Sequence, residues 1–132
     1  MAVKDFEEVI PPAGFGLPEG CRVIKWPKTG ETLDEGDTGK PFPTILYPDV
    51  SVFVFGTITE TVTIQGTPEL ETVPTKYATL HDQSDNALAI TTAPAAAVIV
   101  EHATQVRPSV SSGAGSVADL EVWLVLNTQA RR

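Results

Sequence analysis

Apolar and polar residues alternate with a period of two along much of the chain after Asp49. In the segment 60–65, Val62 and Ile64 fall on one face while Thr63 and Gln65 fall on the other, which is the side-chain pattern of a half-buried strand. Similar short segments, bounded by glycine, proline or aspartate-rich turns, recur along the chain. They predict strands at 21–26, 50–55, 60–65, 77–81, 87–91, 96–101, 105–110 and 119–126.

The connections between these segments are too short to hold the helices that link parallel strands. We therefore expect an all-β fold, an antiparallel β-sandwich of about seven or eight strands, and the jelly roll is one topology that fits. In the last segment Leu120, Val122, Leu124 and Leu126 share one face, which places Trp123 on the opposite face. Phe53 and Phe55 also share a face, and the pattern predicts that they are core residues. Pro108 predicts an edge position or a bulge.

The first 48 residues differ from the rest because they contain seven prolines and one predicted strand, 21–26. The prediction is a division into a Pro/Gly-rich N-terminal arm with one short strand, residues 1–48, and a β-sandwich domain, residues 49–132. Such an extended segment has two alternatives: it reaches a neighbouring subunit, or it packs across its own domain.

Charge and composition restrict the function. The chain of 132 residues has a formal net charge of −8, and such a field repels phosphate backbones, so no nucleic-acid partner is expected. No apolar run approaches the roughly 20 residues that cross a bilayer, and the N-terminus lacks the pattern of a signal peptide, so no membrane partner is expected. Cys21 is the single cysteine, which excludes an intramolecular disulfide.

Few residues suggest catalysis or metal binding. His81 and His102 lack a metal-ligand spacing, although each follows a predicted strand and the two could meet at one rim with Asp82 or Glu101. The turn Asp82–Asn86 has oxygen ligands but not the full spacing of a calcium loop. We therefore predict a protein without enzymatic activity, cofactor or metal.

Aromatic residues are the best candidates for contacts with a partner, because large aromatic side chains dominate protein interfaces. Trp123 is predicted to face outward, and Trp26, Phe42 and Tyr47 lie in the predicted arm. These four residues are the predicted protein-interface residues.

Several short motifs appear in an order that resembles a family. They are Gly36–Phe42, Ser51–Gly56, Thr61–Gly66, Tyr77–Asp82, Asn86–Thr91, the segment Glu101–Pro108 and the closing strand Asp119–Leu126. This layout resembles the small β-sandwich virion proteins of tailed bacteriophages, the capsid decoration or cement proteins. The resemblance covers residues 30–126, and none of its motifs is a catalytic signature.

The resemblance implies a structural virion protein that is assembled in the host cytoplasm and binds the outer capsid surface. It implies the major capsid protein as a partner, self-association as a dimer or trimer, and no cofactor. The main alternative is a tail- or fibre-associated β-sandwich that binds a host-surface glycan. A small hydrolase and a cellular adhesion or scaffold domain are further alternatives.

Overall fold

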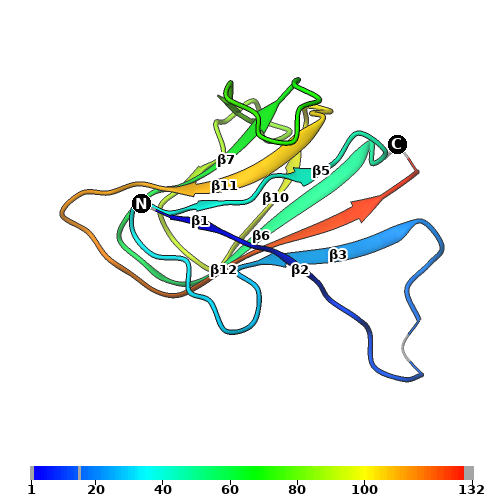
Figure 1. Cartoon of the computed structure of the whole chain (residues 1–132), viewed down its shortest axis with the longest axis horizontal. Helices are drawn as coiled ribbons and strands as arrows, with labels where there is room; N and C mark the ends of the chain where they lie inside the picture. Colours follow the sequence, from blue (N-terminus) through cyan, green and yellow to red (C-terminus); the bar gives the residue numbers. More distant parts are fainter. Residues whose placement is uncertain (1, 15, 130–132) are drawn as a thin grey trace.

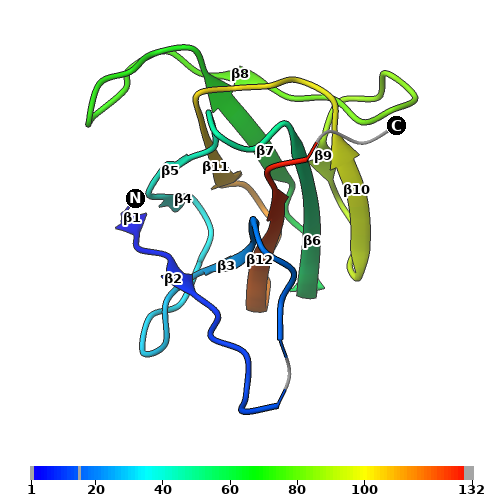
Figure 2. The ribbon, with the colours of Figure 1, turned by 90° about the vertical axis from the view of Figure 1, so that its right-hand side faces the viewer.

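The structure is a computed structural model that describes residues 2–14 and 16–129, and these residues form strands and connections without a helix. Two sheets pack face to face around the core (Figures 1 and 2). The all-β sandwich prediction is therefore confirmed, whereas the jelly-roll topology stays a prediction. No helix able to cross a membrane is found among the described residues.

Sheet A has the strand order β1-β4-β11-β7-β8, with β5 also pairing with β11 and β9 with β7. All of its pairs are antiparallel except β1 with β4. Its strands are β1 (Val3–Lys4), β4 (Thr38–Gly39), β5 (Phe42–Pro43), β7 (Val62–Thr67), β8 (Ala78–Thr79), β9 (Ala89–Ile90) and β11 (Gln105–Val110).

Sheet B has the strand order β10-β6-β12-β3-β2, and all of its pairs are antiparallel. Its strands are β2 (Glu7–Glu8), β3 (Cys21–Trp26), β6 (Asp49–Ile58), β10 (Ala95–Ile99) and β12 (Val117–Asn127). Strand β10 is the outermost strand at the right of Figure 2.

The core lies between the two sheets and is made of alternating inward side chains. On β12 the buried residues are Leu120, Val122, Leu124 and Leu126, as the alternation predicted. On β6 they are Val50, Val52, Val54 and Ile58, whereas Phe53 and Phe55 point outward and their prediction as core residues is wrong. Phe53 and Phe55 make the middle of β6 apolar on both faces, so these two residues by themselves do not indicate which face is buried.

A β-bulge interrupts the pairing of β12 with β6. Ala118 pairs with Thr57 and Glu121 with Phe55, so two residues of β12, Asp119 and Leu120, lie opposite the single residue Gly56. Asp119 has a left-handed φ of 53°, and Gly56 has a φ of 121°. A Cβ atom on Gly56 would lie 2.7 Å from the Asp119 carbonyl oxygen, so this crossing of strands requires glycine.

The predicted N-terminal arm is part of the sandwich in the described residues. β3 lies inside sheet B between β12 and β2, while β4 and β5 pair with β11 in sheet A. Of the two alternatives for this segment, packing across its own domain is the one observed. The backbone amide of Ala2 donates to the buried carboxylate of Asp37 at 3.0 Å, which fixes the start of the chain on the sandwich.

Candidate protein interaction surface

The outer face of sheet B carries a row of large side chains that crosses four strands. Phe53 on β6 pairs with Trp123 on β12, Trp123 pairs with Lys25 on β3, and Lys25 pairs with Glu7 on β2. Directly paired residues of antiparallel strands project from the same face of a sheet. The row therefore runs from an aromatic half to a charged half.

The aromatic half consists of three rings in contact. Phe53 and Phe55 stack with their centroids 6.4 Å apart and their planes at 7°, and Trp123 meets Phe55 edge to face at 6.5 Å and 89°. Phe55 is 41% exposed, and Phe53 and Trp123 are half-buried. We call Phe53, Phe55 and Trp123 the aromatic face. These rings lie on the side of sheet B away from the core, and Phe55 exposes the most surface to a partner.

Lys25 and two carboxylates border the aromatic face. The Lys25 ammonium lies 5.6 Å from the Trp123 ring centroid and forms ion pairs with Glu7 at 3.5 Å and Glu121 at 3.7 Å. The Trp123 indole also donates to Glu121 at 3.3 Å. The Thr29 hydroxyl donates to Glu7 at 2.6 Å, and this hydrogen bond lowers the pKa of the Glu7 carboxyl. The charge of Lys25 lowers the same pKa further. These contacts hold the Trp123 ring in one orientation.

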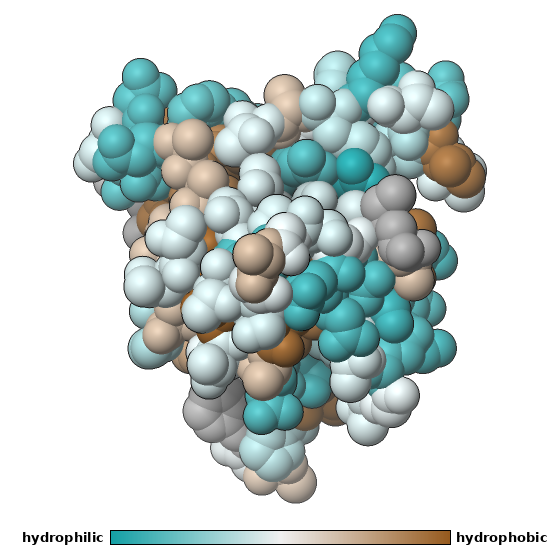
Figure 3. Space-filling view, turned by 90° about the vertical axis from the view of Figure 1, so that its left-hand side faces the viewer, coloured by the Kyte–Doolittle hydropathy of each residue, from teal (hydrophilic) through white to brown (hydrophobic). Residues whose placement is uncertain are grey.

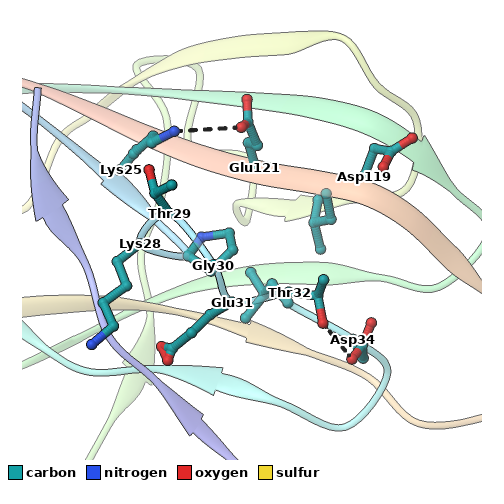
Figure 4. Close-up of a pocket in the computed structure, with 12 residues that line it drawn as sticks. Lys25, Lys28, Thr29, Gly30, Glu31, Thr32, Asp34, Asp119 and Glu121 are labelled. Carbon is teal, nitrogen blue, oxygen red and sulfur yellow. Dashed lines mark hydrogen bonds and ion pairs between the residues drawn. The ribbon is translucent and has the colours of Figure 1, made fainter.

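Beyond this border lies a pocket of about 470 Å³ between the 27–34 loop and the bulge of β12. In the view of Figure 4, Lys25 and Lys28 lie at one side, and Asp34 and Asp119 lie at the other. Several of these groups already have partners, as Lys25 pairs with Glu121 and Asp34 accepts a hydrogen bond from Thr32. The pocket therefore provides a polar rim of both charges beside the aromatic face.

The outer face of sheet A is polar by contrast. The Arg107 guanidinium lies 3.6 Å from the Tyr77 ring centroid and donates to the Gln65 side chain at 2.9 Å. Partial burial raises the pKa of Tyr77 and lowers that of Arg107. The two sheets thus differ in the chemistry that they present, since only sheet B places contacting aromatic rings on its outer face within the described residues.

A second apolar area lies among the loops at one end of the sandwich. Two loop lobes stand at the top of Figures 2 and 3, and the space-filling view shows hydrophobic atoms at the tip of one of them. Pro43, Ile45 and Leu70 line a groove of about 410 Å³ here, and Leu70 is 83% exposed. Ile45 and Leu70 come from loops, and Pro43 ends the two-residue strand β5, so these side chains do not form a row across paired strands and we regard sheet B as the stronger candidate.

Three of the four predicted interface residues are core residues. Trp26, Phe42 and Tyr47 are 0%, 5% and 9% exposed, so the exposure on which their assignment as interface residues was based is wrong. The Trp26 indole donates to the Lys40 carbonyl at 2.8 Å, and the Phe6 ring packs edge to face on both Trp26 and Phe42. These side chains are buried because their segments belong to the sandwich. Trp123 is the one that lies on an outer face.

Phe53, Phe55 and Lys25 are the residues of the surface that the sequence analysis missed. Ser51 carried the signal, because a polar residue at the same parity as Phe53 and Phe55 indicates the outer face of the strand. Lys25 could be added only once the register of β3 with β12 was known.

The two histidines do not meet. His81 Nδ1 lies 2.6 Å from the Glu101 carboxylate, whereas His102 Nε2 contacts the Ile45 carbonyl at 2.7 Å. Within residues 2–14 and 16–129, no group of three or more histidine, cysteine, aspartate or glutamate side chains could hold a metal ion.

Comparison of the chain with protein-family models, with curated proteins and with solved structures gives no match. The functional argument therefore depends on the chain's own residues and their geometry.

Proposed function

We propose that the protein is a structural virion protein, a capsid decoration protein that binds the major capsid protein on the outer surface of a tailed-phage head. The observation that carries the proposal is the aromatic face of sheet B. Contiguous exposed apolar side chains bordered by polar residues mark interaction surfaces, and tryptophan is common among the residues that dominate binding energy. The order of short motifs along residues 30–126 supports the specific partner.

Docking through this face uses a surface that is already formed. The rings contact one another, and Lys25 and Glu121 restrain Trp123, so little side-chain entropy is lost when a partner covers them. A rigid module that binds only the assembled shell stabilises it by mass action, and many copies multiply a modest interface. The proposal assigns the chain a binding role without a catalytic step.

Copy number in purified particles tests the proposal. Quantitative mass spectrometry of particles should find the protein at a level comparable to that of the major capsid protein. At limiting protein concentration, particles should bind about 30-fold less of the Phe55→Ser variant than of the wild-type protein. The reason is that loss of an interface anchor costs roughly 2 kcal/mol or more of binding free energy.

Tyr77→Ala provides the matched control, since it removes a half-buried aromatic ring from the other sheet. This variant should reach wild-type occupancy. Equal occupancy of the Phe55→Ser and wild-type proteins would contradict docking through sheet B, and absence of the protein from particles would contradict a virion role.

A tail- or fibre-associated glycan-binding function is a second candidate. It is favoured by the position of Trp123 beside Glu121, Lys25 and the polar pocket, since sugars stack on aromatic rings and hydrogen-bond to adjacent polar groups. In that case particles would hold few copies, and a glycan array would give a signal that Trp123→Ala abolishes.

A further inference from the structure

The free edge of sheet B differs from the other edges of the sandwich. Strand β10 has five residues, Ala95–Ile99, and pairs only with β6 among the described residues. The Val100 amide directly after β10 donates to the His81 carbonyl at 3.0 Å, and no strand of the described residues pairs with the other side of Ala95–Ile99. An unpaired strand edge of this kind is a template for a strand from another chain, and soluble proteins usually protect it.

The remaining edges are protected by shortness or charge. β2 has two residues, Glu7 and Glu8, and both are charged. β1, β8 and β9 also have two residues each, and β1 includes Lys4. These are the common ways in which proteins prevent edge-to-edge pairing, and β10 shows neither of them.

The segment that contains β10 is uncharged over an unusual length. The fifteen residues from Asn86 to Val100 carry no charged side chain, although the chain as a whole has a net charge of −8. Two acidic molecules repel each other at most orientations, whereas pairing along Ala95–Ile99 brings two uncharged strands together, with the His81–Glu101 pair lying at the Val100 end of this edge. The small side chains of Ala95, Ala96 and Ala97 also leave space for a second backbone to approach.

From these observations we propose that β10 pairs with β10 of a second copy of this chain, antiparallel about a two-fold axis near Ala97. A two-fold interface uses the same patch on both subunits, and a single uncharged strand of the same sequence supplies both sides. Sheet B then continues from one copy into the other. The aromatic faces of both copies lie on the same outer side of the continuous sheet, since Ala96 and Val98 pair with Phe53 and Ser51 on that side.

This inference goes beyond the proposed function and does not depend on it, because it concerns the free protein. It assigns self-association to a defined strand and restricts the oligomer to a dimer. Strand pairing about a two-fold axis uses up the edge of each copy, so a third copy finds no equivalent edge.

Sedimentation equilibrium of the full chain over a range of concentrations tests the proposal. Wild type should form a dimer whose fraction rises with concentration. Ala96→Lys should raise the dimer dissociation constant by at least about tenfold, because two like charges then lie beside the axis. Ala118→Lys is the matched control, since Ala118 is an exposed alanine of β12 in the same sheet, away from this edge, and this variant should dimerise like wild type.

A second measurement covers the case in which Ala96→Lys folds poorly. In a Cys21→Ser background, Ala96→Cys should cross-link between copies with a short bifunctional maleimide, and Ala118→Cys should not. A wild-type chain that stays monomeric, a trimer, or an Ala96→Lys variant that dimerises as wild type does would overturn the proposal. Slowed amide exchange in Ala95–Ile99 of a monomeric chain only when it is bound to capsids would also overturn it, and would assign the edge to a strand of the capsid protein.

Discussion

Single carboxylates fix several loops of this protein, so its acidic composition is partly structural. The buried carboxylate of Glu60 accepts hydrogen bonds from the Ser111 hydroxyl at 2.7 Å and the Gly115 amide at 2.5 Å, which orders the Gly/Ser-rich loop after β11. Asp37 accepts from the amides of Ala2 and Asp34 in a similar way. A buried carboxylate needs such donors, because burial without them costs several kcal/mol.

His81 and Glu101 predict a pH dependence of stability. The hydrogen bond to Glu101 raises the pKa of His81 above its ordinary value of 6.5. A group whose pKa is higher in the folded state than in the unfolded state stabilises the fold at pH values below its unfolded pKa. This contribution is lost as the pH rises through the folded pKa. We therefore expect this contribution to the melting temperature of the wild type to be lost as the pH rises above 6.5, the ordinary pKa of histidine, through the raised pKa of His81.

The variants His81→Gln and Glu101→Gln should both flatten this part of the profile, since each removes one partner of the pair. Thermal melts at fixed ionic strength across the range provide the measurement. A wild-type slope retained in His81→Gln would assign the pH dependence to another group.

Strand β11 shows how an element accommodates a proline in the middle of a sheet. Pro108 lies between β7 on one side and the β4–β5 segment on the other, so the predicted edge position is wrong. The bulge alternative fits, because Ser109 pairs with Thr38 and Val106 with Phe42, leaving three residues of one chain segment opposite two of the other. The missing amide of proline is tolerated where the ladder is interrupted.

Gly39 is required at this interruption. A Cβ atom there would lie 2.5 Å from Pro108 Cδ and 2.7 Å from Trp26 Cδ1, both in the core. Gly39→Ala should therefore lower the free energy of unfolding by about 1–3 kcal/mol through overpacking. Urea denaturation measures the change.

Gly16→Ala is the control, because a Cβ atom at Gly16 meets nothing within 4 Å and its φ is not left-handed. Its unfolding free energy should stay within about 0.5 kcal/mol of the wild-type value. A Gly39→Ala variant as stable as wild type would mean that β4 and β11 separate at little cost.

At the level of elements, alternation in the sequence was sufficient to predict most strands. All eight predicted segments overlap a strand of the structure, and 21–26 and 105–110 match to the residue. The two-residue strands β1, β2, β4 and β5 were not predicted, because such short pairings depend on a neighbouring strand and leave no periodic pattern. The candidate surface was predicted only at Trp123, because the apolar character of Phe53 and Phe55 outweighed the single polar residue Ser51 on their face.

For the molecule as a whole, the first 48 residues are a structural part of the sandwich. Ile24 and Trp26 of β3 are fully buried, and Leu33 and Phe42 complete the core from later segments of the same region. The described residues therefore divide into two sheets, and each sheet contains strands from both parts of the chain.

A fragment of residues 49–132 should consequently fail to fold. It lacks β3, which pairs with β12 from Val122 to Asn127. It also exposes the apolar side chains that β3, Leu33 and Phe42 cover. Near-ultraviolet circular dichroism and a thermal melt should show no cooperative transition, in contrast to the full chain. A cooperative, native-like fragment would restore the division into an arm and an independent domain.

The β-bulge opposite Gly56 has a consequence for the fidelity of folding. The inner face of β6 carries valines and its outer face carries Phe53 and Phe55, so a slip of one residue there would exchange valines for aromatic rings at little hydrophobic cost. The left-handed Asp119 and the side-chain-free Gly56 fit each other in one alignment only. This pair of residues therefore disfavours the other registers of β6 against β12. In the register that it favours, valines fill the interior while phenylalanines and tryptophan remain outside.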